Sequence, residues 1–327
     1  MTDKIKNIAG LQHIEQADAI YRIHYPYNLS PVMDKPVTCF MTCESSRILP
    51  QHVFGIDHLG NLGSASGITI VTPSNWSKDG LVRCGIHPDL ITVIPHGVDA
   101  TIFSPATPES KNAIKKALHW EDRFVFLNIG SMSSNKGIDI LLKAFAIVNS
   151  KYPETLLCLK GSNSLYSSSE VLREASHLLN AEEIERVTNN THYLGSDMPF
   201  SSIANLYQAA DVYVAPYRAE GFNIPVLEAA ACGTPIICTS GGPTDDFTID
   251  SFTMRIESTL VSLDEDTFLE PSLDHLVHLM NKIIEDADFR ENAAIYGPLN
   301  TFLNFSWEII VESLIGAITA TTPADGI

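Results

Sequence analysis

Two glutamates eight residues apart are the residues of this sequence best suited to chemistry on a sugar. Glu220 follows an apolar run that predicts a strand, and Glu228 falls within the next predicted helix. The first residues between them are Gly221, Phe222, Asn223 and Ile224. Carboxylates accept hydrogen bonds from sugar hydroxyls, and backbone amides at the start of a helix bind phosphate. Taken singly, each glutamate is also compatible with a helix-dipole partner or a surface residue.

A loop rich in glycine and serine is the second candidate for chemistry. It begins with Gly130 and Ser131 and ends with Lys136 and Gly137, between a predicted buried strand and a predicted helix. Such a loop directs N–H groups and the positive end of the helix toward the carboxyl edge of a sheet. The added charge of Lys136 favours a diphosphate ligand. A solvated turn is an equal alternative, because the loop matches neither the P-loop nor the G-x-G-x-x-G pattern.

Strands and helices that must position these residues alternate along almost the whole chain. Apolar runs predict strands at 19–23, 37–41, 68–71, 91–94, 124–129, 156–159, 192–194, 212–215 and 236–238. Helical spacing and caps predict helices at 74–84, 138–149, 170–180, 203–210, 225–231, 273–286, 288–302 and 307–318. This alternation predicts a doubly wound α/β fold. The polar, proline-containing stretch 104–110 predicts a domain boundary.

Composition excludes several classes of function. A chain of 327 residues predicts about two domains. The net charge of −18 opposes binding to nucleic acid and to anionic membranes, so neither is expected as a partner. Six cysteines lie apart in apolar segments without a C-x-x-C pair, which predicts reduced thiols in a cytoplasmic protein. The eleven histidines show no metal-binding spacing, so neither a metal nor another cofactor is expected.

Taken together, the motifs resemble the retaining nucleotide-sugar glycosyltransferases of family 4 (group 1). The matching segments are Val93-Ile-Pro-His-Gly-Val-Asp99, the loop 130–137, the block from Glu220 to Gly233-Thr-Pro235, and Phe305-Ser-Trp307. Their order and spacing agree with the family from about residue 66 to 320. The resemblance implies the GT-B fold, in which two Rossmann-like domains face a cleft. It implies a reduced acceptor-side domain at 1–105, a nucleotide-sugar-binding domain at 106–303, and a helix at 304–320 that packs back on the first domain.

The resemblance also implies roles for individual residues. Glu220 would contact hydroxyls of the donor sugar, and Glu228 the ribose of the nucleotide. Amides of residues 222–224 would lie against the sugar and the diphosphate, and Lys136 would neutralise the departing diphosphate. The remaining members of the expected donor site are Gly130, Ser131 and Gly221. In this family the acceptor attacks on the face that the diphosphate leaves, so no separate basic residue is required.

The sequence departs from the family pattern at two places. Ser131 stands where the family usually has an arginine, and Arg218 is a candidate to replace that charge. Residues 1–65 look too short for the complete acceptor subdomain, and its early histidine has no clear match. Glu44 follows a predicted strand at about that place, and His96 lies in a turn that borders the cleft in the family. Both are candidate acceptor-side residues, and both are compatible with a purely structural role.

These observations favour a hexosyltransferase that acts on a glycan or a small-molecule acceptor. The alternative is a non-catalytic sugar-nucleotide-binding protein or subunit that needs a partner chain, as Ser131 and the short first domain suggest. An oxidoreductase is disfavoured, because the dinucleotide-binding turn is missing. The D-x-D patterns at Asp264–Asp266 and Asp286–Asp288 are interpreted as solvated, helix-flanking segments. Residues 1–105 contain no Lys/Arg run, so membrane association is not expected. Nucleotide base, sugar, acceptor and oligomeric state are left open.

Overall fold

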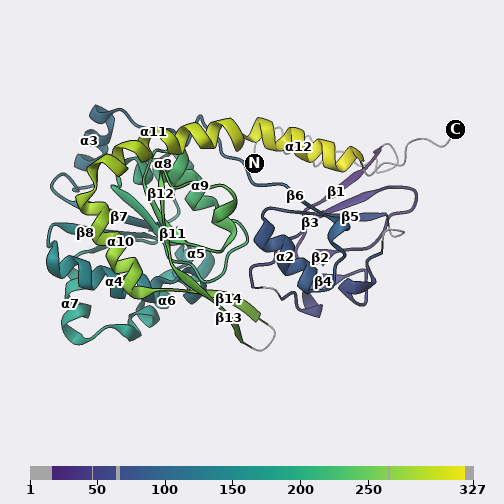
Figure 1. Cartoon of the computed structure of the whole chain (residues 1–327), viewed down its shortest axis with the longest axis horizontal. Coiled ribbons are helices and arrows are strands. Elements are labelled where there is room, and N and C mark those ends of the chain that lie inside the picture. The colour runs from purple at the N-terminus through teal and green to yellow at the C-terminus, as the bar shows by residue number, and fades with distance from the viewer. Residues whose placement is uncertain (1–16, 46, 64–66, 264–265, 321–327) are drawn as a thin grey trace.

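Two α/β domains lie side by side in the computed structural model of this chain, which describes residues 17–45, 47–63, 67–263 and 266–320 (Figure 1). The small domain has a parallel sheet of four strands. In spatial order these are β1 (Ile20–Arg22), β3 (Val37–Phe40), β5 (Ile68–Thr72) and β6 (Ile91–Val93). A short parallel pair, β2 (Tyr27–Asn28) and β4 (Val53–Phe54), lies apart from this sheet.

Short helices complete the small domain. The α-helix is α2 (Asn75–Arg83), and three 3-10 turns lie at Pro50–His52, Leu59–Asn61 and Pro88–Leu90. Ser74 begins α2 as predicted, because its hydroxyl accepts the N–H of Ser77 at 3.1 Å. The four main strands follow the same order in space and in the chain, so this sheet contains no point at which strand order reverses.

The large domain is built on a parallel sheet of six strands. In spatial order they are β12 (Thr253–Ile256), β11 (Ile236–Thr239), β10 (Val212–Ala215), β7 (Phe124–Ile129), β8 (Thr155–Lys160) and β9 (Thr191–Leu194). The chain enters at β7, builds outward through β8 and β9, and then crosses to the other side of β7 at β10. Strand order therefore reverses between β7 and β10, which is where doubly wound sheets bind their ligands.

Helices cover both faces of this sheet. One face carries α3 (Pro108–Ala117), α8 (Phe200–Ala209), α9 (Ile224–Ala231) and α11 (Ala287–Asn304). The other carries α4 (Ile138–Lys151), α7 (Ala181–Asn189) and α10 (Leu273–Glu285). Short helices lie at α5 (Asn163–Tyr166), α6 (Ser168–Glu174) and the 3-10 turns Ser134–Lys136, Ala175–Leu178 and Pro243–Asp246. Burial on both faces explains why the central strands are continuous apolar runs in the sequence.

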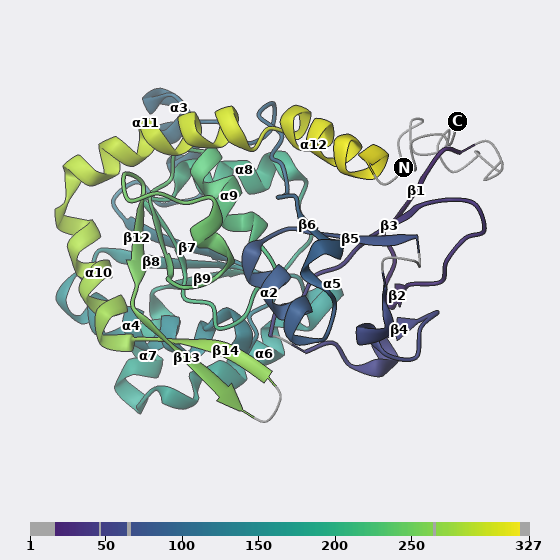
Figure 2. The ribbon, with the colours of Figure 1, turned by 45° about the vertical axis from the view of Figure 1, so that its right-hand side comes forward.

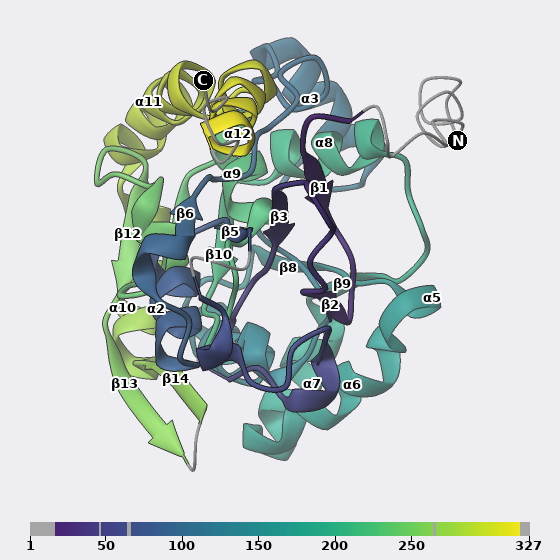
Figure 3. The ribbon, with the colours of Figure 1, turned by 90° about the vertical axis from the view of Figure 1, so that its right-hand side faces the viewer.

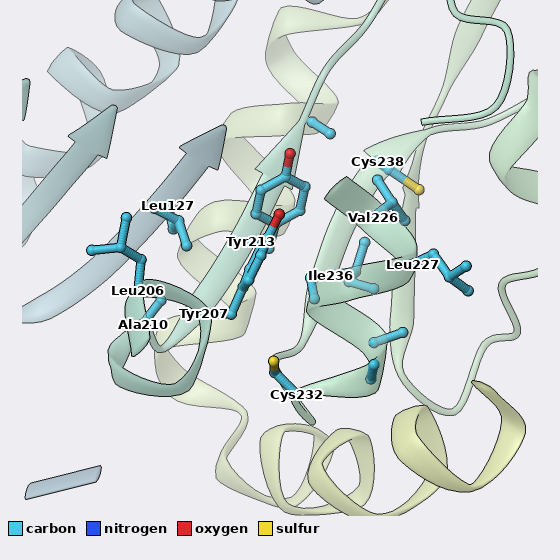
Figure 4. Packing of buried hydrophobic residues seen from close by; sticks show 14 of the residues in the cluster. Leu127, Leu206, Tyr207, Ala210, Tyr213, Val226, Leu227, Cys232, Ile236 and Cys238 are labelled. Atoms are coloured by element: carbon cyan, nitrogen blue, oxygen red, sulfur yellow. The ribbon is translucent and has the colours of Figure 1, made fainter. Parts of the chain in front are cut away.

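The core behind the carboxyl edge of the large sheet is dense and partly aromatic. Figure 4 shows Tyr207 beside Tyr213, with their ring centroids 5.6 Å apart, and both rings are fully buried. Val226 and Leu227 of α9 pack in the same cluster as Ile236 of β11. This packing fixes the start of α9 relative to the ends of β7 and β10.

An antiparallel hairpin, β13 (Ser258–Leu263) and β14 (Asp266–Pro271), projects from the large domain below α2 (Figure 2). The interpretation of Asp266 as part of a helix-flanking segment is wrong, because Asp266 begins β14; Asp264 lies outside the described residues. The hairpin was not predicted because β13 is largely exposed, as at Leu260 and Leu263, so its sequence has no regular apolar alternation.

Two further predicted elements differ from the structure. The single helix predicted at 170–180 is α6 followed by the 3-10 turn Ala175–Leu178, and α7 was missed. The stretch 104–110, predicted as a domain boundary, also contains the start of α3, which was not predicted. Thr107 caps that helix and Pro108 occupies its first turn. Threonine and proline there are helix-start signals rather than linker residues.

The C-terminal helices connect the two domains. Helix α11 belongs to the large domain, and α12 (Trp307–Ala320) runs back over the small one (Figures 1 and 3). Ile310 of α12 is buried against Val71 and Ile94 of the small domain. The chain passes between the domains near Val98 and again near Phe305. At this place the N–H of Val98 donates to the carbonyl of Phe305 at 2.9 Å. The two crossings of the chain between the domains therefore lie side by side.

Direct bonds hold the domains together beside α2. The Ser74 hydroxyl donates to the Gly221 carbonyl at 2.6 Å. The backbone and side-chain N–H groups of Asn75 donate to the two carboxylate oxygens of Asp246, at 2.7 and 3.1 Å. At the hairpin, the N–H of Thr267 donates to the carbonyl of Ser45 at 2.8 Å. The carboxyl edges of the two sheets are thus held facing each other.

Candidate active site

Two loops meet at the point where strand order reverses in the large sheet. One follows β7 and contains residues 130–137, and the other follows β10 and leads to Glu220. The backbone N–H groups of Arg218 and Ala219 both donate to the carbonyl of Asn135, at 2.7 and 3.2 Å. These bonds join the two loops, so side chains that are far apart in the sequence lie next to one another.

Lys136 and Glu220 form an ion pair where the two loops meet. Their Nζ and Oε1 atoms are 2.5 Å apart, and the two side chains are 21% and 10% exposed. Burial raises the pKa of Glu220, the positive charge of Lys136 lowers it, and the negative charge of Glu44 raises it further. Removal from water disfavours the carboxylate, so its ionisation depends on Lys136.

A cavity of about 240 Å³ opens in front of this pair and brings together most of the residues expected from the sequence. Those that line it are Gly130, Lys136, Glu220, Gly221, Phe222, Asn223 and Ile224 from the large domain, and Glu44 and His96 from the small-domain side. Sequence reasoning missed Thr42 and Pro73, which also line it. Both follow the ends of parallel strands, and that position was the available signal.

The start of α9 depends on an unusual backbone conformation. Asn223 precedes the helix with φ of +75°, in the left-handed region, and is buried. A residue other than glycine adopts this conformation at a cost that surrounding packing must offset. The turn directs residues 221–224 along the cavity wall, at the positive end of α9.

His96 lies between the two domains. Its ring centroid is 5.6 Å from that of Phe40 in the small domain and 5.2 Å from that of Phe222 in the large one. Burial lowers the pKa of His96, so the neutral ring is favoured. The residue therefore lines the cavity and also packs the domain boundary.

Glu44 approaches the same cavity from the small domain. Its side chain is exposed, and its backbone carbonyl accepts the indole N–H of Trp76 at 2.7 Å. Trp76 in turn packs against the core of the large domain. Glu44 and Glu220 therefore line the same cavity from the two domains, and the negative charge of Glu44 raises the pKa of Glu220.

Two expected donor-site residues, Ser131 and Glu228, are not among those that line this cavity. The hydroxyl of Ser131 shares a hydrogen bond with that of Ser133 at 2.6 Å. Glu228 lies one turn into α9, where Oε2 accepts the hydroxyl of Tyr207 at 2.9 Å. Burial raises the pKa of Glu228 to about 7. This carboxyl group therefore titrates in the neutral range.

Arg218 does not replace the arginine that Ser131 lacks. Its guanidinium binds both carboxylate oxygens of Asp139, at 2.8 and 3.0 Å, and both of Glu270, at 2.7 and 3.0 Å. The two acids neutralise the guanidinium and tie the β10 loop to α4 and to the hairpin. The suggestion that Arg218 supplies the missing phosphate-binding charge is therefore wrong; its role here is structural.

No group of three His, Cys, Asp or Glu residues within the described ranges is arranged to hold a metal ion. Of the acidic D-x-D segments, Asp266 accepts the hydroxyl of Ser45, and Asp286 accepts the N–H of Phe289 as a helix cap. None of the helices in the described part of the chain is both long enough and apolar enough to cross a membrane.

Comparisons with known proteins agree with this architecture. The model of the family described as "Glycosyl transferases group 1" matches residues 109–299. The GDP-mannose-dependent monoacylated alpha-(1-6)-phosphatidylinositol monomannoside mannosyltransferase of Corynebacterium glutamicum is 30% identical over 238 residues, which is 70% of this chain and 56% of that protein. The D-inositol 3-phosphate glycosyltransferase of an Arthrobacter species is 32% identical over 155 residues, 47% of this chain and 35% of that protein.

Solved structures share the fold over most of the chain. The structure of Anabaena Alr3699/HepE in complex with UDP and glucose matches with a TM-score of 0.68 at 20% identity, covering 88% of this chain and 72% of that one. The chain spans between about a third and somewhat more than half of the length of the curated relatives it matches.

Proposed function

Because this chain belongs to the group 1 glycosyl transferases and has their two-domain GT-B architecture, we propose that it transfers a sugar from a nucleoside-diphosphate sugar to an acceptor hydroxyl. The observation that carries this proposal is the ion pair of Lys136 and Glu220, on the wall of a cavity between the domains. The pair lies at the reversal of strand order, where such sheets bind nucleotides.

The donor binds to the large domain in this proposal. The diphosphate lies at the positive end of α9, beside Lys136, and hydroxyls of the sugar donate to Glu220. Negative charge grows on the diphosphate as the glycosidic bond breaks, and Lys136 stabilises it. Lys136 is paired with Glu220, so in this proposal the diphosphate is a second anionic partner for the same ammonium group.

We assign the retaining mechanism of family 4, since the motifs resemble that family in order and spacing. The acceptor hydroxyl then attacks from the face that the diphosphate leaves, and a phosphate oxygen takes its proton. The bond from the anomeric carbon to the diphosphate oxygen breaks, and the bond to the acceptor oxygen forms on the same face. The neutral ring of His96 and the Lys136-bound Glu220 need not act as bases in this scheme.

The acceptor approaches from the small domain. Thr42 and Glu44 line the cavity from that side and supply a hydroxyl and an exposed carboxylate for hydrogen bonds to hydroxyl groups. A sugar or polyol acceptor fits these side chains. Named activities of the relatives include transfer to inositol-type acceptors, which is the same chemical class.

A second candidate is a sugar-nucleotide-binding subunit that needs a partner chain for turnover. One observation favours this candidate. Position 131 holds a serine where the family usually has an arginine, and the nearby Arg218 is paired with Asp139 and Glu270. One phosphate-binding charge is therefore missing from the donor side. This candidate predicts donor binding without transfer by the purified chain.

Thermal unfolding with UDP, GDP and ADP, added separately, tests the donor site. A nucleotide at about 100 times its dissociation constant stabilises the fold by about 2.7 kcal/mol, a shift of several degrees. We expect one nucleotide to shift the wild type and the shift to be lost in Lys136→Met. The control is Lys143→Met, because Lys143 pairs with Glu183 at 2.7 Å with similar exposure, 23% and 12%, away from the cavity. A shift that survives in Lys136→Met contradicts the site.

Turnover separates the two candidates. The purified chain is incubated with the sugar conjugate of the nucleotide that binds and with a mixed pool of sugar and polyol acceptors. Release of the nucleoside diphosphate together with a glycosylated product, lost in Glu220→Gln, supports the transferase. The anomeric configuration of that product, read by NMR, tests retention. Nucleotide binding without product, until a partner chain is added, supports the subunit.

A further inference from the structure

The last residue of β8, Lys160, is a buried lysine without a carboxylate partner. It is 6% exposed, and it is the only buried lysine or arginine in the described part of the chain. Its ammonium group donates to the backbone carbonyl of Gly161, and none of the ion pairs among the described residues includes it. Burying a charge without an acidic partner costs free energy, so the presence of this lysine needs a reason.

The groups around Lys160 do not offset this cost. Burial lowers the pKa of Lys160, and the negative charges of Asp197 and Cys158 raise it by less. Asp197 is exposed, and its carboxylate accepts the hydroxyls of Ser162 at 3.1 Å and Ser164 at 2.9 Å. An anion that binds beside Lys160 would therefore stabilise its ammonium form.

Lys160 lies one strand away from the candidate active site. It is the register partner of Ile129 in β7, and such partners point to the same face of a parallel sheet, about 4.8 Å apart. Ile129 lines the cavity. The ammonium group of Lys160 is bonded to Gly161, which follows the end of the strand. It therefore lies at the carboxyl edge of the sheet, where such folds bind their ligands.

Gly130 connects this lysine to the one in the cavity. Its N–H donates to the backbone carbonyl of Lys160 at 3.0 Å. A Cβ atom placed on Gly130 would lie 3.8 Å from Cγ of Lys136, so the side chain of Lys136 passes close to the same glycine. The two lysines are thus neighbours of one residue that lines the cavity.

The cavity itself has little positive charge for a diphosphate. The ionisable side chains that line it are those of Glu44, His96, Lys136 and Glu220. With His96 neutral and both carboxylates ionised, this set carries more negative than positive charge. Repulsion would oppose a ligand with two charged phosphates, unless a further cation lies within its reach.

The loop after β7 does not supply that cation, and the donor must extend beyond the cavity. Ser131 is neutral, and the guanidinium of Arg218 is bound to Asp139 and Glu270. The cavity holds about 240 Å³, whereas pockets for drug-sized molecules occupy about 300–1,000 Å³. A nucleoside-diphosphate sugar therefore reaches past the cavity lining, and the end of β8 adjoins that lining.

We propose that Lys160 binds a phosphate oxygen of the donor nucleotide and is the second cation of the donor site. This assignment rests on the proposed glycosyltransferase function. Lys136 and Lys160 then hold the diphosphate from the ends of two neighbouring strands. Lys136 shares its charge with Glu220, whereas Lys160 has no paired carboxylate, so its charge is available to the phosphate.

Calorimetric titration of the full chain tests this assignment. The ligands are the nucleoside diphosphate that shifts thermal unfolding of the wild type and the matching nucleoside, which is measured by competition. Lys160→Met should weaken binding of the diphosphate about 10- to 100-fold and leave binding of the nucleoside unchanged. Its ligand-free Tm should not fall, because the substitution removes an unpaired buried charge. Lys160→Gln, which also removes the charge, is the second variant.

Lys143→Met is the matched control, because Lys143 is paired with Glu183 away from the cavity, and it should bind both ligands as the wild type does. Unchanged diphosphate affinity in both Lys160 variants would overturn the assignment. Equal losses for the diphosphate and the nucleoside would overturn it too, since they would mean that Lys160 shapes the loop without binding phosphate. Failure of the proposed function appears separately, as absence of nucleotide binding by the wild type.

Discussion

At the scale of single residues, the two glutamates of the E-x7-E block occupy different electrostatic environments. Glu220 is paired with Lys136 in the cavity wall, whereas Glu228 has the neutral hydroxyl of Tyr207 as its partner. A hydroxyl stabilises a carboxylate less than an ammonium group does. Burial of Glu228 is thus offset only by a neutral partner, and the pKa of this carboxyl group rises to about 7.

Glu228 should make stability depend on pH. Its pKa rises from 4.5 to about 7 on folding, so its stabilising contribution is present below pH 4.5 and is lost as pH rises through 7. The free energy of unfolding of the wild type, relative to Glu228→Gln, should fall by up to about 3 kcal/mol between pH 5 and 8. Urea titrations at four pH values measure this change.

Glu183→Gln is the matched control for that series. Its ion pair with Lys143 lowers the pKa of Glu183, so its contribution is present above pH 4.5 and is lost only as pH falls below that range. The difference between wild type and this variant should be flat from pH 5 to 8. A Glu228→Gln series with the same flat profile would contradict the assignment.

The sequence predicted most site residues because they lie in contiguous motifs. Residues 220–224 and Lys136 follow strands that apolar runs identify, and a parallel sheet brings such strand ends together. Thr42 and Pro73 were missed because each is an ordinary residue in the sequence and gains its place from the approach of the two domains. The ion pairs of Arg218 could not be predicted either, since Asp139 and Glu270 lie on segments that are distant in the sequence.

At the scale of elements, the loop after β7 is held in place by its close approach to the β10 loop. Gly137 has φ of +67° and lies against the backbone of Pro216. A Cβ atom at this position would be 1.8 Å from the carbonyl oxygen of Pro216. Glycine is therefore required both by conformation and by space, and the position of Lys136 depends on it.

Gly137→Ala should displace the loop and abolish nucleotide-induced stabilisation. We expect a loss of about 3 kcal/mol in the free energy of unfolding, because steric overlap adds to the strain of a positive φ. Gly67→Ala is the control, since Gly67 has the same φ of +67° and, apart from its chain neighbours, no atom of the described residues lies within 4 Å of the added carbon. It should cost about 1 kcal/mol. Equal losses in chemical denaturation would show that overlap with Pro216 is unimportant.

The central strands and the buried helices were predicted well, whereas α3, α7, β12 and the hairpin were missed. The strand Phe124–Ile129 and the helix beginning at Ile138 have strong apolar patterns because the sheet buries them. The hairpin β13–β14 has no such pattern, and its place is set by Ser45 of the other domain. Pairing between distant segments leaves little trace in local sequence.

At the scale of the whole molecule, α12 joins the small domain to the large one. The helix presents Ile310 to Val71 and Ile94, and it leaves Ile315 more than half exposed. The small sheet therefore completes its core with a segment that lies more than 200 residues further along the chain. Its stability should depend on that distant contact.

Ile310→Asp should destabilise the small domain selectively. A carboxylate at this buried position lacks a partner and should cost about 3 kcal/mol or more. Ile315→Asp, in the same helix but 55% exposed, should change stability by less than about 0.5 kcal/mol. Hydrogen exchange of β5 and β6 measures the effect, which should appear there before it appears in β7. Uniform exchange throughout the chain would contradict a selective role for α12.

The late position of α12 has a consequence for synthesis on the ribosome. Helix α12 follows every other described element, so the residues that Ile310 buries are translated long before Ile310 itself. Translation proceeds at roughly 5–20 residues per second, so α12 is synthesised more than about ten seconds after the strands that contain Val71 and Ile94. During that interval the apolar surface of Val71 and Ile94 lacks the side chain of Ile310 that buries it in the folded protein.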